Sequence, residues 1–210
     1  MKRLCVLVCI LMSSCRPAQQ LPPGGEIARA VSLAKANGKT EGVVSVLIER
    51  STHGELDDVL RASSVVLVQP IDSSVEVTKD HVVTWQRFKV IRWLRQNDFD
   101  HECEGTKKTN NEDGTLVAGF YKGSAVADGI TVRDMTMEHV VFDQPQYLLI
   151  AARCATGVID IPRIEDGIFE VSVDGMLRVP PYSSGSATYV KAILELATVS
   201  SLEKRLSSLN

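Results

Sequence analysis

The sequence has no apolar run long enough to form a permanent membrane-spanning helix. Its N-terminal apolar stretch, residues 4–12, is nine residues long, whereas a spanning helix needs roughly 20. We therefore expect no transmembrane anchor. The 44% hydrophobic content nevertheless indicates a folded domain and not a disordered chain.

A basic cluster is also missing. Residues 1–14 contain two basic and no acidic residues, which leaves 21 basic and 26 acidic residues and a net charge of −5 in the remaining 196 residues. Binding to nucleic acid needs clustered Lys and Arg side chains that follow the phosphate backbone. We therefore expect no nucleic-acid partner.

The common catalytic and metal-binding motifs are absent as well. The sequence contains no G-x-S-x-G, P-loop, G-x-G-x-x-G or H-E-x-x-H motif. Residues 101–103, His-Glu-Cys, are adjacent and cannot easily surround one metal ion. An EF-hand loop aligned on Gly114 would place Phe120 where a bidentate Glu is needed. The sequence therefore predicts no catalytic residue, no cofactor and no metal site. A loose calcium site built from carbonyl and carboxylate oxygens over 110–114 is the alternative.

The isolated histidines and acids do not suggest a catalytic pair either. His53, His81 and His139 stand alone beside expected strands or turns, so they are interpreted as surface or structural residues. Asp134 and Asp143 have no carboxylate partner in a distinct environment, so no acid/base pair can be assigned.

The N-terminus, by contrast, has the three parts of an export signal. Lys2 and Arg3 form a basic start, residues 4–12 form the apolar core, and Ser13-Ser14-Cys15 supplies small residues for processing. Ordinary cleavage nearby, which would release a secreted or periplasmic soluble protein, is the alternative.

The segment Leu11-Met12-Ser13-Ser14-Cys15 resembles the lipobox of bacterial lipoproteins, with Met12 where that family most often has leucine. The resemblance implies that Cys15 is the lipidation site and the first mature residue, so that membrane lipid is a partner through acylated Cys15. Arg16 in the next position implies sorting to the periplasmic face of the outer membrane in a two-membrane bacterium. Several acyl chains would give durable attachment.

The domain organisation follows from this leader. Residues 1–14 are expected to be a signal peptide and residues 15–25 a lipidated flexible tether with three prolines and two final glycines. Residues 26–210 are expected to form a single globular domain, with a β core over about 42–178 and a C-terminal helix over about 186–208.

Two of the five cysteines remain after the leader and Cys15 are set aside. Cys103 and Cys154 are an even pair in an exported chain, and the oxidising compartment favours a disulfide between them. Closing a loop of about 50 residues would stabilise the fold by up to about 4 kcal/mol in the chain-entropy model. The alternative is two unpaired thiols.

Hydrophobic periodicity predicts an α+β fold, mainly antiparallel β, built as a small OB-like barrel or curved sheet with peripheral N- and C-terminal helices. Helices are expected over 26–37, 54–62 and 186–208, the last with a restart near Ser200, which has capping-box spacing to Glu203. Strands are expected over 43–48, 65–68 (ending at Pro70), 81–94, 115–121, 138–142, 147–153, 157–161 and 168–173, with a long loop over 96–114.

Two pairs of strand-like segments, residues 62–68 with 84–91 and residues 146–151 with 167–175, resemble exported OB-like barrels of the netrin and tissue-inhibitor type. The resemblance covers roughly residues 55–178 and implies a fold but no activity. Gln69 stands where those modules usually carry glycine, and Arg95-Gln96 stands where they carry a lysine-glycine turn.

Three functions are compatible with these observations. The first is a non-catalytic, membrane-tethered module that binds an envelope protein or a surface component. The second is an exported hydrolase whose site assembles from residues far apart in the sequence, and the third is a secreted inhibitor. An acylated Cys15 does not match the free N-terminal cysteine of the metalloprotease inhibitors, and the loop over 96–114 is too polar and breaker-rich for a rigid inhibitory loop. We therefore prefer the binding module.

Overall fold

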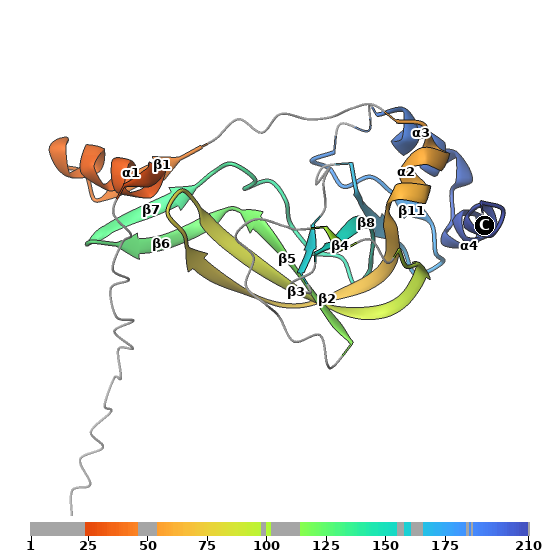
Figure 1. Ribbon diagram of the computed structural model, residues 1–210. Helices are drawn as coiled ribbons and strands as arrows, with labels where there is room; N and C mark the ends of the chain where they lie inside the picture. The colour runs from red at the N-terminus through yellow and green to blue at the C-terminus, as the bar shows by residue number, and fades with distance from the viewer. Residues whose placement is uncertain are drawn as a thin grey trace, which may run out of the picture.

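A curved sheet of eight strands, a three-stranded sheet and four helices make up the described part of the chain (Figure 1). The computed structural model describes residues 24–45, 54–97, 100–101, 114–154, 158–160, 166–183, 185 and 187–209. Most strand pairs are antiparallel, and the helices lie at the periphery. The α+β class predicted from the sequence is confirmed.

The helices are α1 (Gly25–Ala36), α2 (Leu56–Ala62), α3 (Thr188–Leu196) and α4 (Val199–Ser207). The strands are β1 (Glu41–Val44), β2 (Ser64–Val77), β3 (Val82–Arg95), β4 (Asp100–His101), β5 (Thr115–Tyr121), β6 (Gly123–Ala127), β7 (Ile130–Asp134), β8 (Tyr147–Cys154), β9 (Val158–Asp160), β10 (Ile168–Val171) and β11 (Leu177–Arg178).

Five strands of the larger sheet form a curved, partly open barrel. The strands β2, β3 and β5 are joined by antiparallel pairing, and β8 returns to lie antiparallel beside β2. Three successive strands with the fourth beside the first make a Greek key. The short strand β9 pairs with both β5 and β8, over two residue pairs each. This arrangement is consistent with the curved sheet or open barrel that the sequence predicts.

The strand β2 continues through Pro70, so the prediction that it ends there was wrong. The pairing of β2 with β8 ends at Val68, and beyond that residue β2 pairs with β3. Pro70 therefore lies where the strand has a neighbour on one side, next to a register shift between Pro70 and Asp72. A proline is tolerated on an edge or at a bulge because no ladder hydrogen bond depends on its missing N–H.

Turns, and not the predicted strand over 138–142, fill one end of the barrel. Met137 and Val140 are buried in the same apolar cluster as Phe88 and Phe120. The ring of Phe142 packs edge-on against Phe88, with 5.0 Å between the ring centroids. The apolar residues of this segment therefore serve the barrel core without a strand partner.

The small sheet has the order β1-β7-β6, and α1 covers one of its faces. The buried side of α1 carries Ile27, Ala30, Val31 and Ala34, at the spacing of one helical face. These side chains pack against residues of β1, β6 and β7, including Val132. The N-terminal helix is thus confirmed within one residue at each end of its predicted range.

The first turn of α1 is held by the turn between β2 and β3. The backbone N–H of Glu26 donates to Asp80 Oδ1 at 3.1 Å, and the N–H of Ile27 donates to the Lys79 carbonyl at 3.3 Å. The first amides of a helix have no partner within the helix, so this turn caps α1 from outside. Gly25 has φ +88°, and a Cβ atom there would lie 2.4 Å from the Lys79 carbonyl oxygen. The close approach therefore requires glycine.

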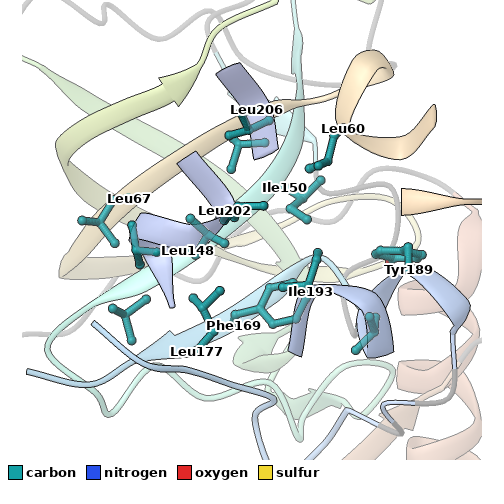
Figure 2. Close-up of a cluster of buried hydrophobic side chains, with 14 of the residues drawn as sticks. Leu60, Leu67, Leu148, Ile150, Phe169, Leu177, Tyr189, Ile193, Leu202 and Leu206 are labelled. Atoms are coloured by element: carbon teal, nitrogen blue, oxygen red, sulfur yellow. The ribbon is translucent and has the colours of Figure 1, made fainter. Parts of the chain in front are cut away.

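The C-terminal helices pack with α2 on a second apolar cluster, which Figure 2 shows. Strands β2, β8 and β10 contribute residues to it, among them Leu67, Leu148 and Phe169, and α3 and α4 contribute residues such as Ile193 and Leu202. Burial of each such side chain contributes about 1.5–3 kcal/mol. The C-terminal apolar stripe therefore covers the outside of the sheet.

The helical break near the C-terminus lies two residues before the predicted restart. The sequence predicts a cap at Ser200, whereas Thr198 is the N-cap of α4 and its side chain accepts from the Ser201 N–H at 3.1 Å. Ala197 between the helices has φ +63°. The predicted helix over 186–208 is therefore two helices.

Candidate functional site

An aspartate at the end of β7 and a histidine just before β3 form a buried polar pair between the two sheets. Asp134 is fully buried, and its Oδ2 lies 2.9 Å from His81 Nδ1. The same oxygen accepts from the Val82 N–H at 3.1 Å, and Oδ1 accepts from the Thr136 N–H at 3.0 Å. The carboxylate therefore joins the start of β3 to the turn that follows β7.

The electrostatics of this site favour an ionised Asp134. Burial alone would raise the pKa of Asp134, but hydrogen bonds from His81 and Thr136 and the charge of His81 outweigh it, so the pKa is lowered. An ionised carboxylate accepts hydrogen bonds and donates none. The hydrogen bond therefore assigns the Nδ1 proton to His81, and in the neutral ring Nε2 is the acceptor.

The imidazole of His81 is oriented from two sides. It stacks on the ring of Tyr121, with 4.0 Å between centroids and 13° between planes, while Asp134 holds its Nδ1 edge. The His81 side chain is 17% exposed. Among the described residues its ring hydrogen bonds with Asp134 alone, so Nε2 is the nitrogen that can meet a ligand.

Beyond this pair, polar and aromatic side chains line one face of β3. Because alternate residues of a strand point to the same side, Trp85, Arg87 and Lys89 share one face. Trp85 Nε1 donates to Glu76 Oε2 at 2.9 Å, and Arg87 Nε donates to Asp72 Oδ1 at 3.0 Å. These contacts join the outer faces of β2 and β3.

A second polar group lies at the barrel end near β8. The hydroxyl of Tyr147 donates to Asp143 Oδ1 at 3.3 Å and accepts from the Gln144 N–H at 2.9 Å. Burial raises the pKa of Tyr147 to about 12. These bonds hold the turn before β8 in place.

An open depression is separate from both groups. It is lined by Leu94, Arg95, Gln96, Asn97, Leu206 and Ser207. The side chain of Asn97 donates to the carbonyls of Arg61 and Ser63 and thereby ties the end of β3 to α2. Asn97 therefore has a structural role in this depression, where it joins the end of β3 to α2.

The site residues predicted from the sequence lie mostly outside the described residues. This holds for Cys15, for Cys103 and for His53. Cys154 ends β8, and only its backbone position is described. The parallel pairing of β4 with β8 places His101 opposite Cys154, so the backbone two residues before Cys103 lies beside Cys154.

A disulfide between Cys103 and Cys154 remains a prediction. Mass mapping without reductant is expected to join the peptides that contain these two residues, because the export expected from the sequence would place the chain in an oxidising compartment. Cys103→Ser should release Cys154 for alkylation. Alkylation of both thiols in the untreated wild-type protein would contradict the bond.

The His81–Asp134 pair was missed from the sequence. His81 was interpreted as an isolated surface or structural residue, whereas it is bonded to a carboxylate 53 positions away. No local pattern links the two residues, since their contact depends on how β7 meets the β2–β3 turn.

Comparison with known proteins gave no match to a family model, a curated protein or a solved structure. None of the described helices has both the length and the apolar character needed to cross a bilayer. Among the described residues, no group of three or more His, Cys, Asp or Glu side chains is placed to hold a metal ion.

Proposed function

We propose that this protein is an exported lipoprotein, held at a bacterial membrane by lipid on Cys15, that acts as a non-catalytic binding module of the cell envelope. The observation that carries the proposal is the N-terminal order of a basic start, a nine-residue apolar stretch and Ser13-Ser14-Cys15. Acyl chains on one cysteine attach a protein durably without a spanning helix, since each buried methylene contributes about 0.8 kcal/mol.

The position of α1 supports attachment by a short tether. The helix begins at Gly25, ten residues after Cys15, and ten extended residues span at most about 35 Å. A lipid on Cys15 would therefore keep the body within that distance of the bilayer surface. Arg16 supports the periplasmic face of an outer membrane as the location.

The His81–Asp134 pair favours a second candidate, an exported hydrolase. In nucleophilic catalysis, a carboxylate orients an imidazole that acts as the general base for a nucleophile. The pair of His81 and Asp134 would supply the base and the orienting group. In the described part of the chain, no hydroxyl or thiol side chain hydrogen bonds to the His81 ring. The hydrolase would need a nucleophile from elsewhere, and we therefore rank it second to the binding module.

Cys15→Ala tests the proposal directly. In a bacterial host, the wild-type chain is expected to incorporate radiolabelled fatty acid and to enter the detergent phase on partitioning, and the variant is expected to lose both properties. Cys103→Ala is the matched control, and it should keep the label because its sulfur is not the lipid site. Persistent labelling of Cys15→Ala would overturn the anchoring.

A further inference from the structure

One face of β2, β3 and β5 carries polar and aromatic side chains from the His81–Asp134 pair to Lys89, with the buried Val83 between His81 and Trp85. The antiparallel register places Ser74, Trp85 and Gly119 side by side across the three strands, and it places Asp72 and Arg87 in the next row. At about 3.3 Å per residue, the length from His81 to Lys89 is about 26 Å. We call this surface the β3 face. It consists of the β3 side from His81 to Lys89 together with the residues of β2 and β5 that pair with it.

Aromatic rings occupy the centre and one end of the β3 face. The six-membered ring of Trp85 lies against Gly119, where an added Cβ atom would be 2.7 Å from Trp85 Cζ3. Glu76 holds the indole N–H of Trp85. At the end of the face, Tyr121 is 40% exposed and stacks on His81. Each of these rings is therefore fixed by a neighbour and does not need a ligand to orient it.

Charged groups of both signs lie beside the aromatic rings. Arg87 and Asp72 form a forked pair with side chains that are 47% and 54% exposed. Lys89 is exposed one row further along β3, and Glu76 is half-buried at Trp85. The two carboxylates would repel a chain of phosphates, whereas hydroxyl groups of a neutral ligand can donate to them and accept from Arg87.

Helix α4 reaches β3 beyond this surface. Arg92 Nη1 lies 2.8 Å from Glu203 Oε1 of α4, on the far side of Lys89 from Trp85. In the described part of the chain, the helices α2, α3 and α4 pack on the cluster that contains Leu67 and Leu148. The apolar packing of these helices therefore uses a different part of the sheet.

We infer that the β3 face binds a neutral glycan chain that lies along β3, with a sugar ring on Trp85 and hydroxyl groups bonded to Asp72, Arg87 and Glu76. Aromatic rings offer a flat apolar surface to the C–H face of a sugar. The carboxylates of Asp72 and Glu76 accept from its hydroxyl groups, and the guanidinium of Arg87 donates to them. This inference rests on the proposed binding function and gives it a ligand class.

The experiment uses the purified full chain carrying Trp93→Phe, which leaves Trp85 as its single tryptophan. Trp85 fluorescence is followed during titration with chito-oligosaccharide, with cello-oligosaccharide and with single-stranded DNA. A saturable change is expected with at least one of the two sugars and none with DNA. The absence of a change with either sugar, or a stronger response to DNA, would overturn the inference.

Single substitutions in the otherwise wild-type chain test whether the β3 face is the surface that binds the sugar. By calorimetry, Trp85→Ala and Arg87→Ala are each expected to weaken sugar binding about tenfold or more. Lys191→Ala, on the exposed side of α3, is the control and should bind as the wild type does. Far-ultraviolet circular dichroism establishes folding, and Arg87→Ala keeps the test valid if Trp85→Ala does not fold. Unchanged affinity in a folded Arg87→Ala or Trp85→Ala protein would contradict the site, whatever Cys15→Ala shows about anchoring.

Discussion

Asp134→Ala is expected to lower the free energy of unfolding by about 3 kcal/mol, since it leaves buried hydrogen-bond donors without an acceptor. The lost acceptor serves His81 Nδ1 and the backbone N–H groups of Val82 and Thr136. Urea unfolding followed by circular dichroism measures the change. Asp58→Ala is the control because Asp58 is 74% exposed in a surface pair with Arg61, and it should change stability by at most about 0.5 kcal/mol.

The same comparison has an expected pH dependence. The pKa of Asp134 in the folded state lies below its ordinary value of 3.8, so the ionised form stabilises the fold. That contribution is complete above the unfolded-state pKa and is lost as the pH falls through the folded-state pKa. The stability difference between wild type and Asp134→Ala should therefore shrink as the pH falls below about 4. A difference that did not shrink between about pH 4 and about pH 2 would contradict this assignment.

Gly25→Ala is expected to cost about 3 kcal/mol, because the backbone strain and the clash with the turn add to each other. The new Cβ atom would lie 2.4 Å from the Lys79 carbonyl oxygen, so α1 or the turn must move. Either movement breaks the bonds from the Glu26 and Ile27 amides. Faster hydrogen exchange at these two amides would report the loss directly.

Gly38→Ala is the matched control for that prediction. Gly38 also has a positive φ, +62°, but a Cβ atom there would have no neighbour within 4 Å. The cost should therefore be limited to about 1 kcal/mol of backbone strain. Equal losses of stability in the two variants would show that conformation, and not contact with Lys79, explains the requirement at Gly25.

The sequence predicts best the elements whose pattern is local. Helix α1 has its apolar residues on one helical face and ends before Gly38, and β3 has a long β-rich sequence. The hairpin of β6 and β7 was missed, although Asp128-Gly129 between the strands is a turn signal and both residues have positive φ. The sequence therefore does contain a local signal for this hairpin.

Other features depend on contacts between distant residues. Pro70 lies inside a strand because β8 no longer pairs with β2 there, and that pairing joins segments about 80 residues apart. The pair of His81 and Asp134 was missed for the same reason, because the two residues are 53 positions apart in the sequence. The β3 face likewise depends on the register that sets Trp85 against Gly119, which alternation along one strand does not determine.

The contact of α1 with the β2–β3 turn determines how this protein would bear load. A pull on the chain before Gly25 enters the body at the first turn of α1, where Asp80 and Lys79 accept the two amide hydrogen bonds. Force therefore passes directly into the longest hairpin of the large sheet, whose two strands have 14 residues each. Tension on the chain before Gly25 would therefore load these two hydrogen bonds and the β2–β3 turn before it reached the rest of α1.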